Sequence, residues 1–141
     1  MMTIKEAQEK LIKEFNEYMD WEDKYAAIIK MGKEMPPFPE EYRIEKNKIH
    51  GCQSQVWMNA RLDGDKVIIE AESDAMIVKG LIAMLIKVYS NQSPKEILNN
   101  PPDFVKQIGI DSHLSPTRKN GLGAMLKQIQ MYALAFSTIL K

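Results

Sequence analysis

Cysteine has the most distinctive side-chain chemistry in this sequence, and the 141 residues contain one, Cys52. It lies in the stretch IHGCQSQVW, residues 49–57, directly after Gly51. Glycine lets the backbone turn tightly, and a strand-like pattern follows, so we expect the thiol on a loop that leads into a strand. Cysteine is also common as a small buried apolar residue. From spacing alone, a passive buried thiol and a reactive thiol are equally good interpretations.

The two histidines, His50 and His113, are the side chains that could act together with the thiol. A structural zinc site needs four nitrogen or sulfur ligands, and this set falls short, so we predict no metal site. A cysteine–histidine hydrolase is a second option, because His50 is two residues from Cys52 and would point to the same side in extended backbone. His113 could approach in space. No glycine-rich oxyanion loop accompanies them, and polar surface positions are the simpler interpretation of both histidines.

Thiol exchange with a second protein makes a different demand on the segment. The sulfur must be reachable by a partner, which favours a loop, and it must be shielded between encounters from small thiols and oxidants. Gln53 and its two polar neighbours offer hydrogen bonds without charge. A free thiol with a pKa of about 8.5 is mostly protonated at neutral pH, so we expect Arg118 or the start of a following helix to stabilise the thiolate. We also expect the loop to hold the thiol inward at rest and to extend on docking.

Composition restricts the classes of function. Nineteen Lys and Arg residues balance nineteen Asp and Glu residues, and aromatic residues make up 8%, so we predict no nucleic-acid partner. The first twenty residues are too charged for a secretory signal, and the longest apolar run, 76–89, contains lysines and is too short to span a bilayer. One cysteine permits no internal disulfide, which is typical of a reducing compartment. We therefore expect a cytoplasmic protein with no membrane contact.

The elements before the thiol are predicted to be helical. Thr3 and Glu6 form a capping-box pair, and apolar residues at three- and four-residue spacing predict a helix over 4–19. Asp20 is expected to cap a second helix that ends at residue 30 or 31. Gly32 fits the left-handed position after that end.

A hairpin is predicted to follow the thiol. The Pro-rich and then charged segment 35–48 is expected to be a surface connection. Residues 55–62 alternate between apolar and polar side chains, Asp63-Gly64 is a two-residue hairpin signal, and 66–72 supplies the return strand. A further strand from 42–50 is an option.

Four helices are predicted after the hairpin. Ser73 is expected to cap a helix through 89, with Asp74 in its first turn and burial on nearly all sides. Two short helices and a long C-terminal helix follow. Ser93-Pro94 is expected to start the first of these, Gly109 to end the second and Ser115-Pro116 to start the third.

Gly121 and Gly123, near the start of the long helix, are poor helix formers and suggest close approach of another backbone. The order of elements predicts one α+β domain over 1–141. Its helices are expected to pack on one face of a small antiparallel sheet.

Residues 51–57, GCQSQVW, resemble the signature of SufE-type cysteine desulfuration proteins. Other stretches resemble the same family in the same order, so the resemblance spans nearly the whole chain. These stretches are WEDKYAAIIKMGKEMP (21–36), SDAMIVKGLIAML (73–85), SPKEIL (93–98) and HLSPTRKNGLGAM (113–125). The resemblance implies a SufE/NifU-like fold. Cluster scaffolds of that fold use three cysteines, so with one cysteine we expect no cluster on this chain.

The resemblance also implies a function. Cys52 matches the cysteine that accepts persulfide sulfur from a SufS-type desulfurase, whose pyridoxal phosphate belongs to that partner. The acceptor stimulates the desulfurase and passes sulfur to the Suf scaffold; it is a transfer partner rather than an enzyme and needs no cofactor of its own. Asp74 and Arg118 match positions near the thiol or the docking surface, and His50, Gly51 and Gln53 flank the acceptor. We expect a monomer or a weak homodimer.

Two other functions stay open from the residues themselves. A cysteine-dependent hydrolase or transferase would act on a small molecule through Cys52. A non-reactive adaptor would bind its partner without using the thiol.

Overall fold

The computed structural model describes residues 2–51 and 54–140, so the predictions for Cys52 and Gln53 concern residues outside the described ones. The described part of the chain combines helices with a two-stranded antiparallel sheet, which confirms the predicted α+β class. The helices are α1 (Ile4–Asn16), α2 (Trp21–Lys33), α3 (Met76–Tyr89), α4 (Pro94–Asn99), α5 (Asp103–Ile108) and α6 (Pro116–Ile139). The strands are β1 (Val56–Asp63) and β2 (Lys66–Ser73), and short 3-10 turns lie at Glu40–Tyr42, Glu45–Asn47 and Asp111–His113.

The two strands form the predicted hairpin. Their register runs from Val56 opposite Ser73 to Asp63 opposite Lys66. The chain turns at residues 64 and 65, one residue later than the Asp63-Gly64 signal suggested, and Gly64 has a φ of 64°. The optional strand in 42–50 is reduced to a single bridge between Lys48 and Trp57.

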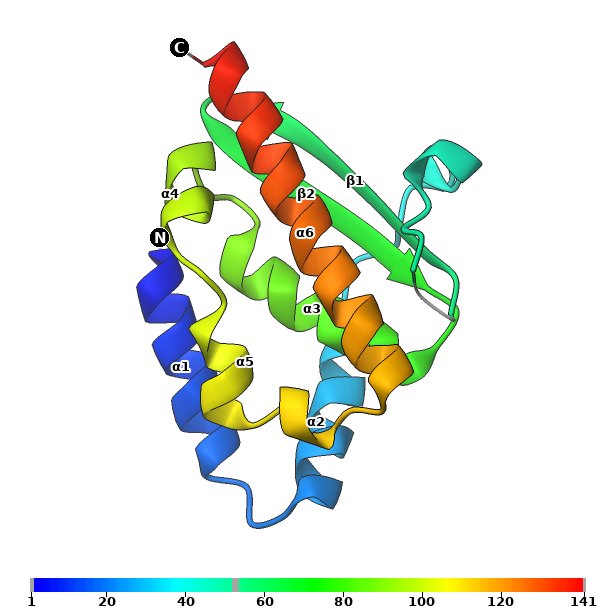
Figure 1. The fold of residues 1–141 in the computed structure, drawn as a ribbon, viewed down its shortest axis with the longest axis vertical. Helices are drawn as coiled ribbons and strands as arrows, with labels where there is room; N and C mark the ends of the chain where they lie inside the picture. The colour runs from blue at the N-terminus through cyan, green and yellow to red at the C-terminus, as the bar shows by residue number, and fades with distance from the viewer. Residues whose placement is uncertain (1, 52–53, 141) are drawn as a thin grey trace.

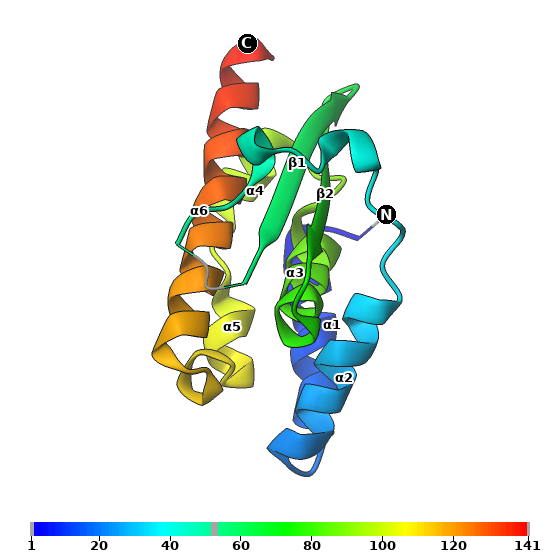
Figure 2. The ribbon, with the colours of Figure 1, turned by 90° about the vertical axis from the view of Figure 1, so that its right-hand side faces the viewer.

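Helix α3 lies at the centre of the core. It runs back along β2. Just after the helix ends, the Gln92 carbonyl accepts a hydrogen bond from the Val67 amide of β2 over 2.8 Å. Ten of its residues are buried, as its apolar sequence predicted, and it contacts β2, α1, α2 and α6. In Figure 1, α6 crosses one face of the hairpin, and Figure 2 shows the segment around residues 39–43 on the opposite side.

Four of the predicted N-terminal caps and one predicted C-terminal cap are present. Thr3 and Glu6 form both hydrogen bonds of the capping box, although α1 ends at Asn16 rather than at 19. Asp20 accepts from the amide of Asp23 at the start of α2. Ser93 and Ser115 accept from the amides three residues on, and Gly109 closes α5 with a φ of 89°.

The prediction for Ser73 and Asp74 was wrong in its local geometry. Helix α3 begins at Met76 without a side-chain cap, and the Ser73 hydroxyl accepts from the amide of Ala75. Asp74 lies before the helix, where its carboxylate binds Gln55 instead of the first helical turn. A tertiary hydrogen bond has taken the place of a local cap.

The prediction for Gly32 was also wrong, because α2 continues through it. Gly32 lies where α2 crosses α3 at Gly80: a Cβ on Gly32 would lie 2.7 Å from the Gly80 nitrogen, and a Cβ on Gly80 would lie 2.1 Å from the Ile28 carbonyl oxygen. These glycines therefore allow close contact between the two helices. The close approach expected at Gly123 is absent within the described residues, since a Cβ there would have nothing within 4 Å.

Gly80, which lies at the helix contact, and Gly123, which has open space around it, give a matched test of this contact. We expect Gly80→Ala to lower the free energy of unfolding by about 2 kcal/mol or more, because its methyl group would overlap backbone. Gly123→Ala should raise it by about 1 kcal/mol, because alanine favours the helix and has room. Urea denaturation measures both, and equal effects would contradict the assignment.

Candidate functional site

The segment that contains Cys52 is closed at its base by the strand that follows it. The Ile49 amide donates to the Val56 carbonyl over 2.8 Å, and both side chains are buried. The bridge between Lys48 and Trp57 continues this pairing by one residue on each side, in the direction away from residues 50–55. Residues 50–55 therefore form a short segment between two fixed ends.

Asp74 fixes the downstream end of this segment. Its carboxylate accepts from the Gln55 amide over 3.0 Å, and its own amide donates to the Gln55 carbonyl over 3.3 Å. The Asp74 side chain is exposed, so these hydrogen bonds, rather than burial, hold it in place. The structure thus brings Asp74 to the thiol segment, as a residue that binds its backbone.

Gly51 and His50 lie on the upstream arm. Gly51 has a φ of 95°, a backbone conformation that residues with a side chain rarely adopt. A Cβ placed on it would lie 3.7 Å from the Cβ of Ala124 in α6. His50 is exposed in the turn. At Gly51 the segment therefore passes close to the N-terminal half of α6.

A pocket of about 330 Å³ lies beside the segment, between α3 and the start of α6. Its apolar lining comes from both helices, and its polar lining comes from Ser54 and the first turn of α6. The apolar side chains are Val78, Leu81, Leu122 and Met125, and the polar ones are Ser54, Ser115, Thr117 and Arg118. Thr117 was not singled out from the sequence, whereas Ser54 was expected only to offer hydrogen bonds and Ser115 only to start the long helix.

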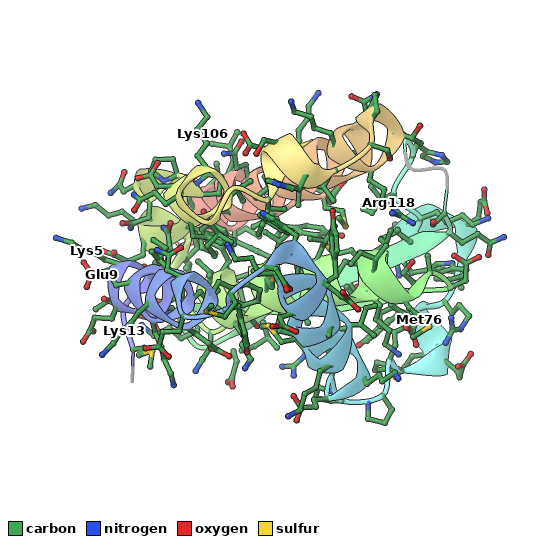
Figure 3. All side chains as sticks on the ribbon, turned by 90° about the horizontal axis from the view of Figure 1, so that it is seen from below. Lys5, Glu9, Lys13, Met76, Lys106 and Arg118 are labelled. Atoms are coloured by element: carbon green, nitrogen blue, oxygen red, sulfur yellow. The ribbon has the colours of Figure 1, made fainter. Side chains whose placement is uncertain are left out.

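Arg118 is the cation of this pocket. Its amide donates to the Ser115 hydroxyl at the start of α6, and its side chain is exposed. Within residues 2–51 and 54–140, no acidic side chain lies within ion-pair distance of it. Figure 3 shows Arg118 at the same end of the molecule as Met76, the first residue of α3, which is 57% exposed.

His113 packs against the start of α2. Its ring stacks on Trp21 with centroids 3.8 Å apart, and its Nδ1 lies 3.0 Å from the Gly109 carbonyl oxygen. Tyr25 donates its hydroxyl proton to the His113 carbonyl, and Lys24 lies over the Trp21 ring. These contacts hold the chain before α6 against α2, and they give His113 a packing role at this junction.

The geometry fits a thiol segment held beside a pocket, and the comparison with protein families gives its context. A family model described as SufE, Fe–S metabolism associated domain, matches residues 9–133. This chain belongs to the SufE family. An uncharacterized SufE-like protein of Synechocystis sp. is 38% identical over 127 residues, which cover 90% of this chain and 80% of the relative. The SufE family assignment gives the chain a role in iron–sulfur metabolism.

A solved structure supports the fold. The solution structure of a hypothetical protein from Thermus thermophilus matches with a TM-score of 0.79 at 24% identity, covering 94% of this chain and 96% of that one. At that identity the likeness supports the fold alone.

Two further findings bear on ligands and membranes. Among the described residues, no group of three or more His, Cys, Asp or Glu side chains is placed to hold a metal ion. Likewise, none of the described helices is both long and apolar enough to cross a membrane.

We expect Asp74→Ala to release the downstream end of the segment. In this variant a small alkylating reagent should modify Cys52 severalfold faster than in the wild type. The free energy of unfolding should fall by about 1 kcal/mol, because a hydrogen bond to a charged group is lost. Asp74→Asn keeps the acceptor oxygen and should stay near the wild-type rate. Identical rates for the alanine variant and the wild type would contradict this role.

His113→Ala separates a packing role from a catalytic one. Loss of the stack on Trp21 should lower the free energy of unfolding by about 1 kcal/mol. The pH profile of Cys52 alkylation should be unchanged, because the ring is engaged elsewhere. A shifted profile would show that His113 tunes the thiol.

Proposed function

We propose that this SufE-family chain accepts sulfur on Cys52 from the persulfide of a SufS-type cysteine desulfurase. The observation that carries the proposal is the segment 50–55, which is held at both ends and lies beside a pocket with a cation on its rim. The chain has no second thiol with which to form an internal disulfide. A single cysteine on a segment of this kind suits exchange with another protein.

The reaction is a thiol–persulfide exchange. The Cys52 thiolate attacks the outer sulfur of the donor's Cys–S–SH group, a new S–S bond forms at Cys52, and the donor's S–S bond breaks. The donor cysteine leaves as a thiolate and takes up the proton that Cys52 has lost. No external oxidant or reductant is needed, because one S–S bond replaces another.

The residues around the pocket supply what the exchange demands. The apolar side chains of α3 and α6 offer a shielded resting place for a sulfur group. The Arg118 guanidinium and the N-terminus of α6 are positive, which favours a thiolate or persulfide anion nearby. Release of the segment from this region on docking would expose the sulfur.

The remaining parts of the proposal concern partners. The desulfurase supplies its own pyridoxal phosphate, and this chain contributes an acceptor that raises desulfurase turnover by removing the persulfide. The loaded chain then delivers sulfur to the Suf scaffold. The chain acts in the cytoplasm as a transfer partner rather than as an enzyme.

A loading experiment tests the proposal. Incubation with a SufS-type desulfurase, cysteine and pyridoxal phosphate should add one or more sulfur atoms to the intact mass of the wild-type chain. Cys52→Ser should gain none and should fail to stimulate the desulfurase. No mass gain on the wild type, together with ester or thioester turnover by the isolated chain, would favour the hydrolase instead. Partner binding that persists in Cys52→Ser without sulfur transfer to the wild type would favour the adaptor.

A further inference from the structure

Arg43 and two aromatic rings form a cluster beside β1, on the side of the hairpin away from α6 (Figure 2). The Arg43 guanidinium carbon lies 4.9 Å from the Trp57 ring centroid and 5.8 Å from that of Phe38. Trp57 is 9% exposed, and Phe38 is 6% exposed. Arg43 therefore packs against two rings that are themselves nearly covered.

Acidic side chains fix the orientation of this guanidinium. Its Nε and Nη2 each donate to one carboxylate oxygen of Glu40 over 2.9 Å, and Nη2 lies 3.8 Å from Glu72 of β2. Glu72 in turn pairs with Lys79 of α3 over 3.1 Å. The hydrogen bonds from Arg43 hold the pKa of the Glu40 carboxyl below its usual value, so the carboxylate stays charged. A two-bond contact of this kind requires the planar fork of arginine.

The cluster joins the two sides of the thiol segment. Arg43 belongs to the chain that leads into the segment, and Trp57 belongs to the strand that leaves it. Lys48 forms the bridge with Trp57 and also places its ammonium group 6.0 Å from that ring. Next to this bridge is the hydrogen bond from Ile49 to Val56 that closes the segment.

We propose that Arg43 is a positioning residue for sulfur acceptance: by packing on Trp57 and binding Glu40 and Glu72, it holds the upstream end of segment 50–55 in register with β1. It touches no reacting atom and acts through Trp57 and the bridge at Lys48. The inference rests on the proposed function, because it assigns Arg43 to that same site. It differs from the role of Asp74, which binds the downstream end.

Arg61 offers a matched control. It lies on β1 and pairs with Glu70 of β2 over 3.6 Å, with a side chain that is 51% exposed. Both arginines thus face an acid on β2, but Arg61 lies toward the hairpin turn and away from the segment. If Arg43 acted only through its ion pair with β2, Arg43→Ala and Arg61→Ala should therefore have the same effect.

The experiment compares wild type, Arg43→Ala, Arg43→Lys and Arg61→Ala by two readouts. The first is the second-order rate of Cys52 alkylation by iodoacetamide at fixed pH, which needs no partner. The second is desulfurase stimulation, separated into its half-saturating concentration of the chain and its maximal rate. Thermal unfolding is recorded for each variant, so that measurements are made well below its Tm.

We expect Arg43→Ala to raise the alkylation rate and the half-saturating concentration roughly two- to fivefold, the change that one cation–π contact can supply, with the maximal rate preserved. Arg43→Lys should lie between wild type and Arg43→Ala, because it keeps the charge and loses the fork; it also serves if Arg43→Ala fails to fold. Arg61→Ala should match the wild type in both readouts.

Equal alkylation rates for wild type and both Arg43 variants, or equal changes in the Arg43 and Arg61 variants, would overturn the inference. The two arms also separate this inference from the proposed function. If wild type takes up no sulfur from the desulfurase, the proposed function fails, while the alkylation arm still decides whether Arg43 holds the segment.

Discussion

The hydrogen bond from Ile49 to Val56 is the constraint on which the rest of the site depends. It closes residues 50–55 into a short segment at the entrance to β1, so the chain must leave and re-enter the fold at nearly the same place. Without this closure the thiol would be attached to a long connection that begins after α2. The bond from Gln55 to Asp74 and the stack of Arg43 on Trp57 support the same closure from its two sides. A segment that is fixed at its ends can expose its middle without loss of the core.

The helices matter to the site because they set the position of these anchors. The glycine contact between α2 and α3 allows the helices to cross closely, and α3 then runs along β2 with Asp74 just before its start. Helix α6 lies across the hairpin, where the Tyr132 hydroxyl donates to the Met58 carbonyl over 3.0 Å. Its first turn brings Arg118 and two hydroxyl side chains to the pocket. Packing far from the thiol therefore determines which groups surround it.

Most of the secondary structure could be predicted from local sequence signals, because these signals act within a few residues. The capping box at Thr3, the hairpin and the apolar helix before Tyr89 are examples. The wrong predictions share a cause. Gly32 and Asp74 have local explanations in the sequence, as a helix end and a helix cap, but each is used for a contact with a distant segment. Such long-range contacts leave no periodic pattern in a single sequence.

The same limit applies to the site. The motif around Cys52 and the resemblance to SufE proteins pointed to this segment. The resemblance linked Asp74 to it, and Arg118 was named both by the resemblance and as a cation that could stabilise the thiolate. The stacking of Arg43 on Trp57 had no local signal, because the two residues are far apart in sequence and neither type is unusual at its position. His113 was open to a catalytic interpretation until its stack on Trp21 was visible. Geometry was needed to separate residues that hold the segment from residues that merely carry suitable chemistry.

A single-turnover transfer tests the central claim most directly. A SufS-type desulfurase is loaded with persulfide, freed of cysteine, and mixed with this chain, and both proteins are then analysed by mass after rapid alkylation. The account predicts that each sulfur lost from the donor appears on the tryptic peptide that spans residues 49–61, at Cys52. Sulfur that remains on the donor, or that is released as sulfide while Cys52 stays a free thiol, would contradict it.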